Sequence, residues 1–275
     1  IPPFPFRTNG IIIFPSGKFE TFVTIDELKV VDSKYYKILD SYQFVPDGKL
    51  VYPFKEFVES MYGKRLQLKK DGNPLQLPIK IILNSIYGKT GQKINRIMGN
   101  LFNPVIFASI TGHTRARLYD FVMKNSIENQ VVFFATDSIC TTKQLDIDSE
   151  KLGEFSLEEK ADDVFVLQNG FYRFNGKWKQ RGMGKLGSKE IEHLETFEKN
   201  GKLYYRFKVL RSSRLRSSIL QDSISQIGKI RGHVREVNLN ADRKRLWLGN
   251  INSIATLNYA NSVPISLNHL PNQNI

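Results

Sequence analysis

One carboxylate, Asp137, stands between two short uncharged runs in the stretch VVFFATDSICTT (residues 131–142). A carboxylate on a strand turn suits a divalent metal ion, and such ions catalyse phosphoryl transfer. That chemistry usually needs at least two carboxylates, and Ala135 occupies the place where a second would be expected. The stretch is therefore either half of a metal site or a hairpin with an acidic tip.

A second group of polar residues recurs at helical spacing in LQLPIKIILNSIYG (residues 75–88). At about 100° per residue, Lys80, Asn84 and Tyr87 fall on one helix face within roughly 60°. This spacing predicts a helix, ended by Gly88, whose front carries a cation, an amide and an aromatic ring. Its apolar residues point elsewhere and are expected to pack on the protein: Ile79, Ile82, Leu83 and Ile86.

The preceding segment, PFKEFVESMYGKRLQLKK (residues 53–70), predicts a helix with Pro at its first turn. Arg65 and Lys69 share one face because they are four residues apart. The sequence DGNP breaks the chain after this segment, so the two helices should fold back as an antiparallel pair. Three cations and an amide can then converge on one anion, and a triphosphate fits that set. The alternative is a helix pair with solvated Lys and Arg.

Weaker patterns predict the remaining elements. Residues 10–24 predict two strands around a Pro-Ser-Gly turn, and residues 163–181 predict strands with an Asn-Gly hairpin turn. A boundary is expected near residue 185, and the last fifteen or so residues predict a loose tail. A helix over residues 104–125 is expected to bury one stripe of side chains: Ile106, Ile110, Leu118, Phe121 and Val122.

The charge balance indicates a polyanionic partner. Forty Lys and Arg against 27 Asp and Glu give a formal net charge of +13, and nucleic acid is the commonest polyanion for such a chain. The alternatives are a basic solvated surface without a partner and, less favoured, an anionic membrane surface. No apolar run could span a bilayer, the first residues lack a secretory-signal layout, and the single Cys140 excludes an intrachain disulfide. An intracellular protein is the simplest interpretation.

The motifs resemble those of family B DNA polymerases. KIILNSIYG (80–88) is similar to the family's Lys-x-x-x-Asn-Ser-x-Tyr-Gly motif, and FFATDS (133–138) is similar to its Tyr-x-Asp-Thr-Asp-Ser motif. MYGKRLQLK resembles the first fingers helix, and SITGHTRARLYD (109–120) resembles the palm helix between the second and third motifs. PFRTNGIIIFPSGKFETFVTIDEL (5–28) is similar to the stretch after the first catalytic motif. The resemblance covers about residues 5–182, and its spacing resembles the protein-primed branch of viruses and mobile elements.

The resemblance implies a nucleotide site on the two predicted helices. Lys80 and Asn84 would hold the triphosphate of the incoming dNTP, together with Arg65 and Lys69. Tyr87 would pack beside the nascent base pair.

The resemblance also implies the metal and template contacts. Asp137 would bind the catalytic divalent ions, Mg²⁺ or Mn²⁺, which makes Asp137 and Lys80 the implied catalytic residues. Thr136 and Ser138 would shape the turn around Asp137 and lie near the DNA. Gly88 would let the backbone approach the template strand.

The stretch FYRFNGKWKQRGMGK (171–185) resembles the family's post-catalytic hairpin, which grips the primer. Strand periodicity places Lys177, Lys179 and Arg181 on one face, where they would contact phosphates. Tyr172 stands in an imperfect copy of the family's Lys-x-Tyr motif and is also expected to touch DNA. The alternative is a solvated basic strand.

The sequence departs from the family in two places. No stretch matches the first catalytic motif, an Asp followed by Ser-Leu-Tyr-Pro, or the proofreading exonuclease domain, and Ala135 replaces the first Asp of the Asp-Thr-Asp motif. Asp26, Asp32 and Asp40 are carboxylates that could replace the missing catalytic Asp, although none is surrounded by the sequence of the family's motif. We therefore expect a second polymerase subunit or an N-terminal segment to carry the exonuclease and the first catalytic Asp.

The sequence thus predicts an α+β fold: a polymerase palm with an antiparallel β-sheet and helices, two-helix fingers and a small thumb-like C-terminal region. The expected domains are palm over residues 1–52, fingers over 53–92, palm with the Asp137 hairpin over 93–185, and thumb-like region over 186–275. The expected function is that of a DNA-directed DNA polymerase core or subunit, which adds dNTPs to a primer 3′-end on primer-template DNA by two-metal phosphoryl transfer, without a membrane partner. The alternatives are a catalytically inactive, polymerase-derived nucleic-acid-binding subunit and a basic RNA- or ribosome-associated module. The cytoplasm or nucleoid is the expected location, with a virus or plasmid as a candidate source.

Overall fold

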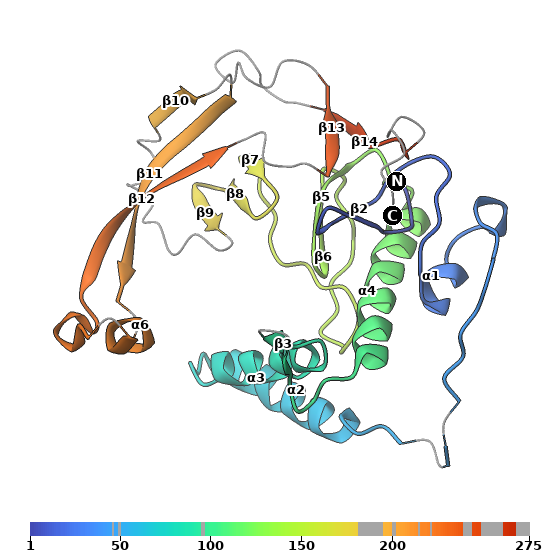
Figure 1. Ribbon diagram of the computed structural model, residues 1–275, viewed down its shortest axis with the longest axis horizontal. Helices are drawn as coiled ribbons and strands as arrows, with labels where there is room; N and C mark the ends of the chain where they lie inside the picture. Colours follow the sequence, from blue (N-terminus) through green and yellow to red (C-terminus); the bar gives the residue numbers. More distant parts are fainter. Residues whose placement is uncertain are drawn as a thin grey trace. The chain divides into compact units, whose positions relative to one another are not determined.

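Helices and small antiparallel sheets of two or three strands make up the described part of the chain (Figure 1). This mixture is compatible with the predicted α+β class. The chain divides into two units, one of residues 1–21, 133–135 and 159–275 and the other of residues 22–132 and 136–158. The computed structural model describes residues 1–45, 47–48, 51–94, 97–180, 195–199, 202–213, 215–220, 222–238, 244–248 and 261–267.

The unit of residues 22–132 and 136–158 is mainly helical. Its elements are α1 (Ile25–Lys29), the 3-10 helix Ser33–Tyr35, α2 (Lys55–Lys70), α3 (Gln76–Thr90), β3 (Lys93–Ile94), β4 (Ile97–Met98), α4 (Pro104–Asn125) and β6 (Ser138–Thr141). Helices α2 and α3 pack against each other, and both α1 and α3 contact α4. Because only a short link joins α2 to α3, their contact makes them run in roughly opposite directions.

The other unit consists mainly of strands. Its elements are β1 (Phe6–Thr8), β2 (Ile11–Ile13), β7 (Val164–Gln168), β8 (Phe171–Phe174), β9 (Lys177–Gln180), β10 (Glu195–Lys199), β11 (Lys202–Ser212), α6 (Leu215–Leu220), the 3-10 helix Ile224–Gln226, β12 (Ile230–Asn238), β13 (Arg245–Trp247) and β14 (Ser262–Pro264). Strands β7–β8–β9 and β10–β11–β12 form two separate antiparallel sheets. Strand β5 (Val131–Ala135) contributes to both units and pairs with β6.

A buried ion pair joins α1 to α4. Glu27 is only 2% exposed, and its carboxylate accepts hydrogen bonds from Arg115 Nε at 2.7 Å and Arg115 Nη2 at 3.1 Å. The same carboxylate accepts from the backbone N–H and the hydroxyl of Thr24, which begins α1. Gly112 on α4 lies so close to Thr24 that a Cβ atom at that position would collide with the Thr24 side chain.

Local sequence explains where the main elements begin and end. The Asn103 side chain accepts a hydrogen bond from Ile106 N at 3.1 Å and caps α4, whose first turn contains Pro104. The turn between β1 and β2 uses Asn9 and Gly10, with φ of 46° and 74°. Two positive φ angles in succession are typical of the tight turn that Asn-Gly favours.

The main helices agree with the predicted ranges, but several finer predictions are wrong. Helix α3 continues past Gly88 to Thr90, and its cap residue is Gly91. The expected strand pair in residues 10–24 instead uses residues 6–13, because Asn9-Gly10 forms the turn and Pro15-Ser16-Gly17 does not.

Burial corrects two further positions. Ile82 is 45% exposed although Ile79, Leu83 and Ile86 on the same helix are half-buried, and Ile110 is 38% exposed. The tail is only partly as expected, since residues 262–264 form β14 and pair with β13. The boundary expected near residue 185 lies outside the described residues.

Within the described part, no helix has the length and apolar character needed to cross a bilayer.

Candidate functional site

The front of α3 carries the three polar residues that the sequence places there. Lys80, Asn84 and Tyr87 are all exposed. The side that packs inward lies about 100° around the helix from this front, where Ile79, Leu83 and Ile86 are half-buried. The division of this helix into a packed side and a polar front therefore exists in the structure.

The front of α3 is also tied to α4. The Tyr87 ring stacks on Phe107, with centroids 5.6 Å apart and planes 2° apart. Phe107 also lies close against Gly91, where a Cβ atom would stand 2.5 Å from the Phe107 ring. A side chain at Gly91 would therefore push Phe107 and disturb the orientation of Tyr87.

Helix α2 contributes Arg65 and Lys69. Lys69 is exposed, whereas Arg65 is half-buried. The Arg65 Nε atom is buried and has no hydrogen-bond acceptor among the described residues. A buried guanidinium donor without an acceptor is costly.

Asp137 lies at the tip of the β5–β6 hairpin and is exposed. The preceding residue, Thr136, has φ of 47°, in the left-handed region that a β-branched residue rarely adopts. Such backbone strain is found preferentially at functional sites. Cys140 on β6 is half-buried, and burial raises the pKa of its thiol, which disfavours the reactive thiolate.

The residues around Asp137 do not form a complete metal site. Among the described residues, no three His, Cys, Asp or Glu side chains gather closely enough to hold a metal ion. Each of the three acids considered as a replacement for the missing carboxylate contacts a neighbouring residue. Asp26 pairs with His113 at 3.1 Å, Asp32 with Lys34 at 2.9 Å, and Asp40 accepts from Ser41 N at 2.8 Å. The Lys34 ammonium also lowers the pKa of Asp32.

The β8–β9 hairpin presents two of the predicted cations. Lys177 and Lys179 share one face of β9, opposite Phe174 and Tyr172 of β8. Lys177 is exposed, whereas Lys179 forms an ion pair with Glu159 at 3.1 Å.

Aromatic contacts hold the rest of this hairpin. The Tyr172 ring packs on Phe133, with centroids 4.9 Å apart, so part of it is committed to the interior. Arg173 lies between the rings of Phe165 and Trp178, 5.9 Å from each centroid. Arg181 lies outside the described residues.

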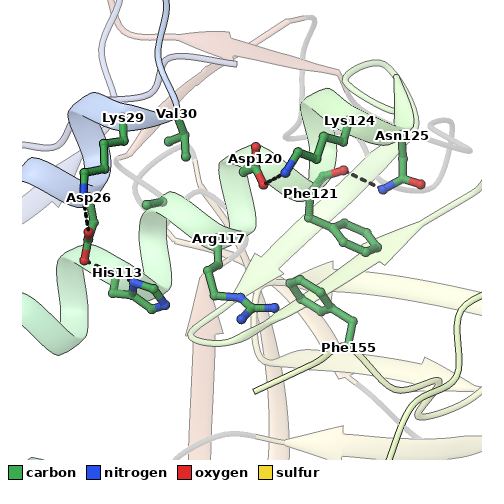
Figure 2. A pocket seen from close by; sticks show the side chains of 11 residues that line it. Asp26, Lys29, Val30, His113, Arg117, Asp120, Phe121, Lys124, Asn125 and Phe155 are labelled. Carbon is green, nitrogen blue, oxygen red and sulfur yellow. Dashed lines mark hydrogen bonds and ion pairs between the residues drawn. The ribbon is translucent and has the colours of Figure 1, made fainter. Parts of the chain in front are cut away.

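A groove of about 470 Å³ runs between α1 and α4, with Phe155 beside it (Figure 2). Of the residues considered from the sequence, Asp26, a possible substitute for the missing carboxylate, lines it, whereas the predicted nucleotide, DNA and metal residues do not. Its acids are already paired, since Asp26 contacts His113 and Asp120 contacts Lys124 at 2.7 Å. Phe155 packs on Phe121 at one side of the groove, so the groove is where a loop residue docks on α4.

These features are a basic helix pair and an acidic hairpin tip, and the comparisons with known proteins give the family. Residues 1–148 match the family described as DNA polymerase type B, organellar and viral. This match covers more than half of the chain, so the chain belongs to that family. The match confirms the assignment made from the sequence. The chain is also 27% identical, over 223 residues, to the protein named DNA polymerase of Acidianus bottle-shaped virus (isolate Italy/Pozzuoli).

That alignment covers 72% of this chain and 31% of the viral protein. The chain thus spans about a third of the length of the curated relative it matches. No solved structure matches the chain significantly.

The structure adds residues that the sequence analysis did not select. The buried Glu27–Arg115 pair positions α1 on α4, and the spacing of Thr24 and Glu27 is the capping pattern that could have indicated Glu27. Glu150 contacts α2 through both its carboxylate and its backbone carbonyl. No local pattern around Glu150 indicates this contact, because it depends on where a long loop lies.

Proposed function

We propose that this chain is the palm and fingers part of a DNA-directed DNA polymerase, which adds dNTPs to a primer 3′-end on primer-template DNA. The observation that carries the proposal is the exposed face of Lys80, Asn84 and Tyr87 on α3, which packs against α2 with its cations Arg65 and Lys69. Membership of the viral and organellar type B family supports it. In this assignment the palm covers residues 1–52 and 93–185, the fingers 53–92 and the thumb-like region 186–275.

The proposed roles of the α2 and α3 residues are binding and orientation. Lys80 supplies a point charge to the triphosphate, and Arg65 supplies a planar set of donors. Asn84 adds an amide, and Lys69 a further cation. Held between two packed helices, a triphosphate would lose translational freedom before any bond changes, which is a major source of rate enhancement.

The family implies a divalent metal cofactor, Mg²⁺ or Mn²⁺, and two-metal phosphoryl transfer. Asp137 alone does not fit such a site, so we assign the further carboxylate to a second subunit or another segment of the polymerase. The proposed contribution of this chain is therefore one carboxylate, held at a strained turn by Thr136 and Ser138. Lys177, Lys179 and Tyr172 are proposed to contact the primer strand, and Gly88 the template.

The decisive experiment compares Lys80→Ala with Lys89→Ala. Lys89 lies on the same helix about 180° away, is exposed, and donates to Gln92 at 2.7 Å. Loss of one charged phosphate contact should weaken dNTP binding at least about tenfold. Lys80→Ala should therefore lose dNTP affinity far more than duplex affinity, while Lys89→Ala should change both little. Equal losses of dNTP and duplex affinity in Lys80→Ala would refute the nucleotide site.

A second candidate function is a polymerase-derived, nucleic-acid-binding subunit without catalysis of its own. The absence of a three-ligand metal group among the described residues favours it. Primer extension separates the two candidates. Extension that appears only when a second polymerase component is added supports the proposed polymerase, whereas no extension with any component supports the binding subunit. Robust extension by this chain alone would contradict the need for a further carboxylate.

A further inference from the structure

The loop Thr142–Glu158 follows β6 and contains no helix or strand. Structureless loops longer than about 12–15 residues are uncommon in compact domains, and many of them are functional. This loop has its own internal contacts. The Ser149 hydroxyl donates to Glu154 at 2.7 Å, and Lys151 pairs with Glu154 at 3.1 Å. A defined turn therefore forms in the middle of the loop.

One residue of this loop holds α2 at two points. The Glu150 carboxylate pairs with Lys70 Nζ at 2.9 Å, and the Tyr62 hydroxyl donates to the Glu150 carbonyl at 3.0 Å. Tyr62 and Lys70 are eight residues apart, which corresponds to about 12 Å along a helix axis. Both side chains reach the same loop residue, so Glu150 is joined to α2 across about two turns of the helix.

The same loop is anchored on α4. The Phe155 ring lies 4.2 Å from the Phe121 ring and 5.7 Å from the Arg117 guanidinium, so Phe155 contacts two side chains of α4 (Figure 2). Near the start of the loop, Lys143 Nζ donates to the carbonyl of Asn125, the last residue of α4. The loop thus connects α4 to α2 through side chains far apart in sequence.

The ion pair with the loop does not use the two cations of the proposed nucleotide face of α2, whereas Tyr62 lies on the same side of the helix as those cations. Measured around the helix from Tyr62, Lys70 lies at about 80°, whereas Arg65 and Lys69 lie at about 300° and 340°. The ion pair with Glu150 therefore uses Lys70 and leaves the two neighbouring cations available.

We propose that Glu150 is a positioning residue for the incoming nucleotide. By restraining α2 against α4, it sets the location of Arg65 and Lys69 relative to the polar front of α3. The inference rests on the proposed function, because it assigns Arg65 and Lys69 to the triphosphate. It adds that the loop after the Asp137 hairpin, and not only the contact of α2 with α3, fixes the nucleotide-binding geometry.

The test uses Glu150→Gln and the charge exchange Lys70→Glu/Glu150→Lys in the full chain. The control is Asp146→Asn, which removes an exposed negative charge from the same loop by the same kind of change as Glu150→Gln. Two readouts are needed: hydrogen exchange of the α2 amides, and titration of a fluorescent dNTP analogue onto the chain with primer-template DNA. The first reports the restraint on α2 and does not depend on nucleotide binding.

Exposed ion pairs contribute up to about fivefold to an equilibrium constant, and the Lys70 and Glu150 side chains are 60% and 67% exposed. Glu150→Gln should therefore speed exchange in α2 and weaken dNTP binding about three- to fivefold. The charge exchange should restore both, because it re-forms the pair without changing the net charge. Asp146→Asn should match the wild type in both readouts.

Three results would overturn the inference. Unchanged exchange in Glu150→Gln would show that the loop does not restrain α2. Faster exchange with unchanged dNTP affinity would show that the contact is structural only. A wild-type chain that binds no dNTP analogue would refute the proposed function and the positioning role with it, and the exchange readout would then show whether the restraint itself exists.

Discussion

The substitution Arg115→Met tests how α1 is held on α4. It removes both hydrogen bonds from the Arg115 guanidinium to Glu27 and leaves a carboxylate that is 2% exposed with only the Thr24 donors. Removing one partner of a buried ion pair typically costs about 3–5 kcal/mol. Because the Arg115 side chain is itself 28% exposed, water can partly solvate the remaining charge. We therefore expect a loss of about 2–3 kcal/mol.

Two companion variants make this magnitude interpretable. Lys124→Met removes an exposed pair with Asp120 on the same helix and should cost less than about 1 kcal/mol. The double variant Glu27→Gln/Arg115→Met removes both charges while the Gln oxygen can still accept from Thr24. It should recover at least half of the loss, because no buried charge remains unpaired.

The assay combines urea unfolding with hydrogen exchange of the α1 amides. Urea unfolding followed by circular dichroism gives the free-energy change, and unchanged slopes with shifted midpoints would show that stability alone has changed. Hydrogen exchange locates the effect, because α1 should open more easily when Arg115 is lost. If Arg115→Met costs no more than Lys124→Met, the buried pair does not hold α1 and the reasoning fails.

Four further substitutions test single positions. Gly112→Ala should lower stability by about 1–3 kcal/mol in urea unfolding, because its Cβ would collide with Thr24; an unchanged midpoint would contradict the close approach of α1 and α4. At Gly88, an added Cβ would meet no atom within 4 Å, so Gly88→Ala should leave stability equal or slightly higher. It should weaken primer-template binding if the template approaches this backbone, and normal binding would exclude that role. Lys177→Ala should reduce by about 0.9 the slope of the logarithm of the DNA-binding constant against the logarithm of salt concentration. Lys179→Ala should reduce this slope by less, because the Lys179 charge is already paired. A larger effect at Lys179 would reverse the assignment of the two lysines.

Most of the helical framework could be predicted from local patterns. Segments 53–70, 75–88 and 104–125 carry apolar side chains at helical spacing and end at turn or cap residues, and α2, α3 and α4 occupy nearly these ranges. Lys80, Asn84 and Tyr87 share a face because they lie on one continuous helix, whose geometry is local. The Asp137 hairpin was predictable for the same reason, since an apolar run on each side of a short turn favours two paired strands.

Burial and strain were less predictable, because they depend on neighbours distant in sequence. Ile82 has the same side-chain type as Ile79, yet Ile82 is 45% exposed and Ile79 is half-buried. Thr136 carries no sign of its positive φ, since the closure of the β5–β6 turn imposes it. These outcomes follow from which surfaces meet, and periodicity along one segment does not contain that information.

The sequence by itself determined the family, the helix that presents Lys80, and the isolation of Asp137 from a second carboxylate at position 135. Residue identity and spacing within single elements suffice for those conclusions. Only the tertiary structure decided that Glu27 and Arg115 bury a charge pair and that Glu150 reaches Lys70 and Tyr62. These partners are 80 to 88 residues apart along the chain, so their contacts depend on long-range packing, which no local pattern encodes.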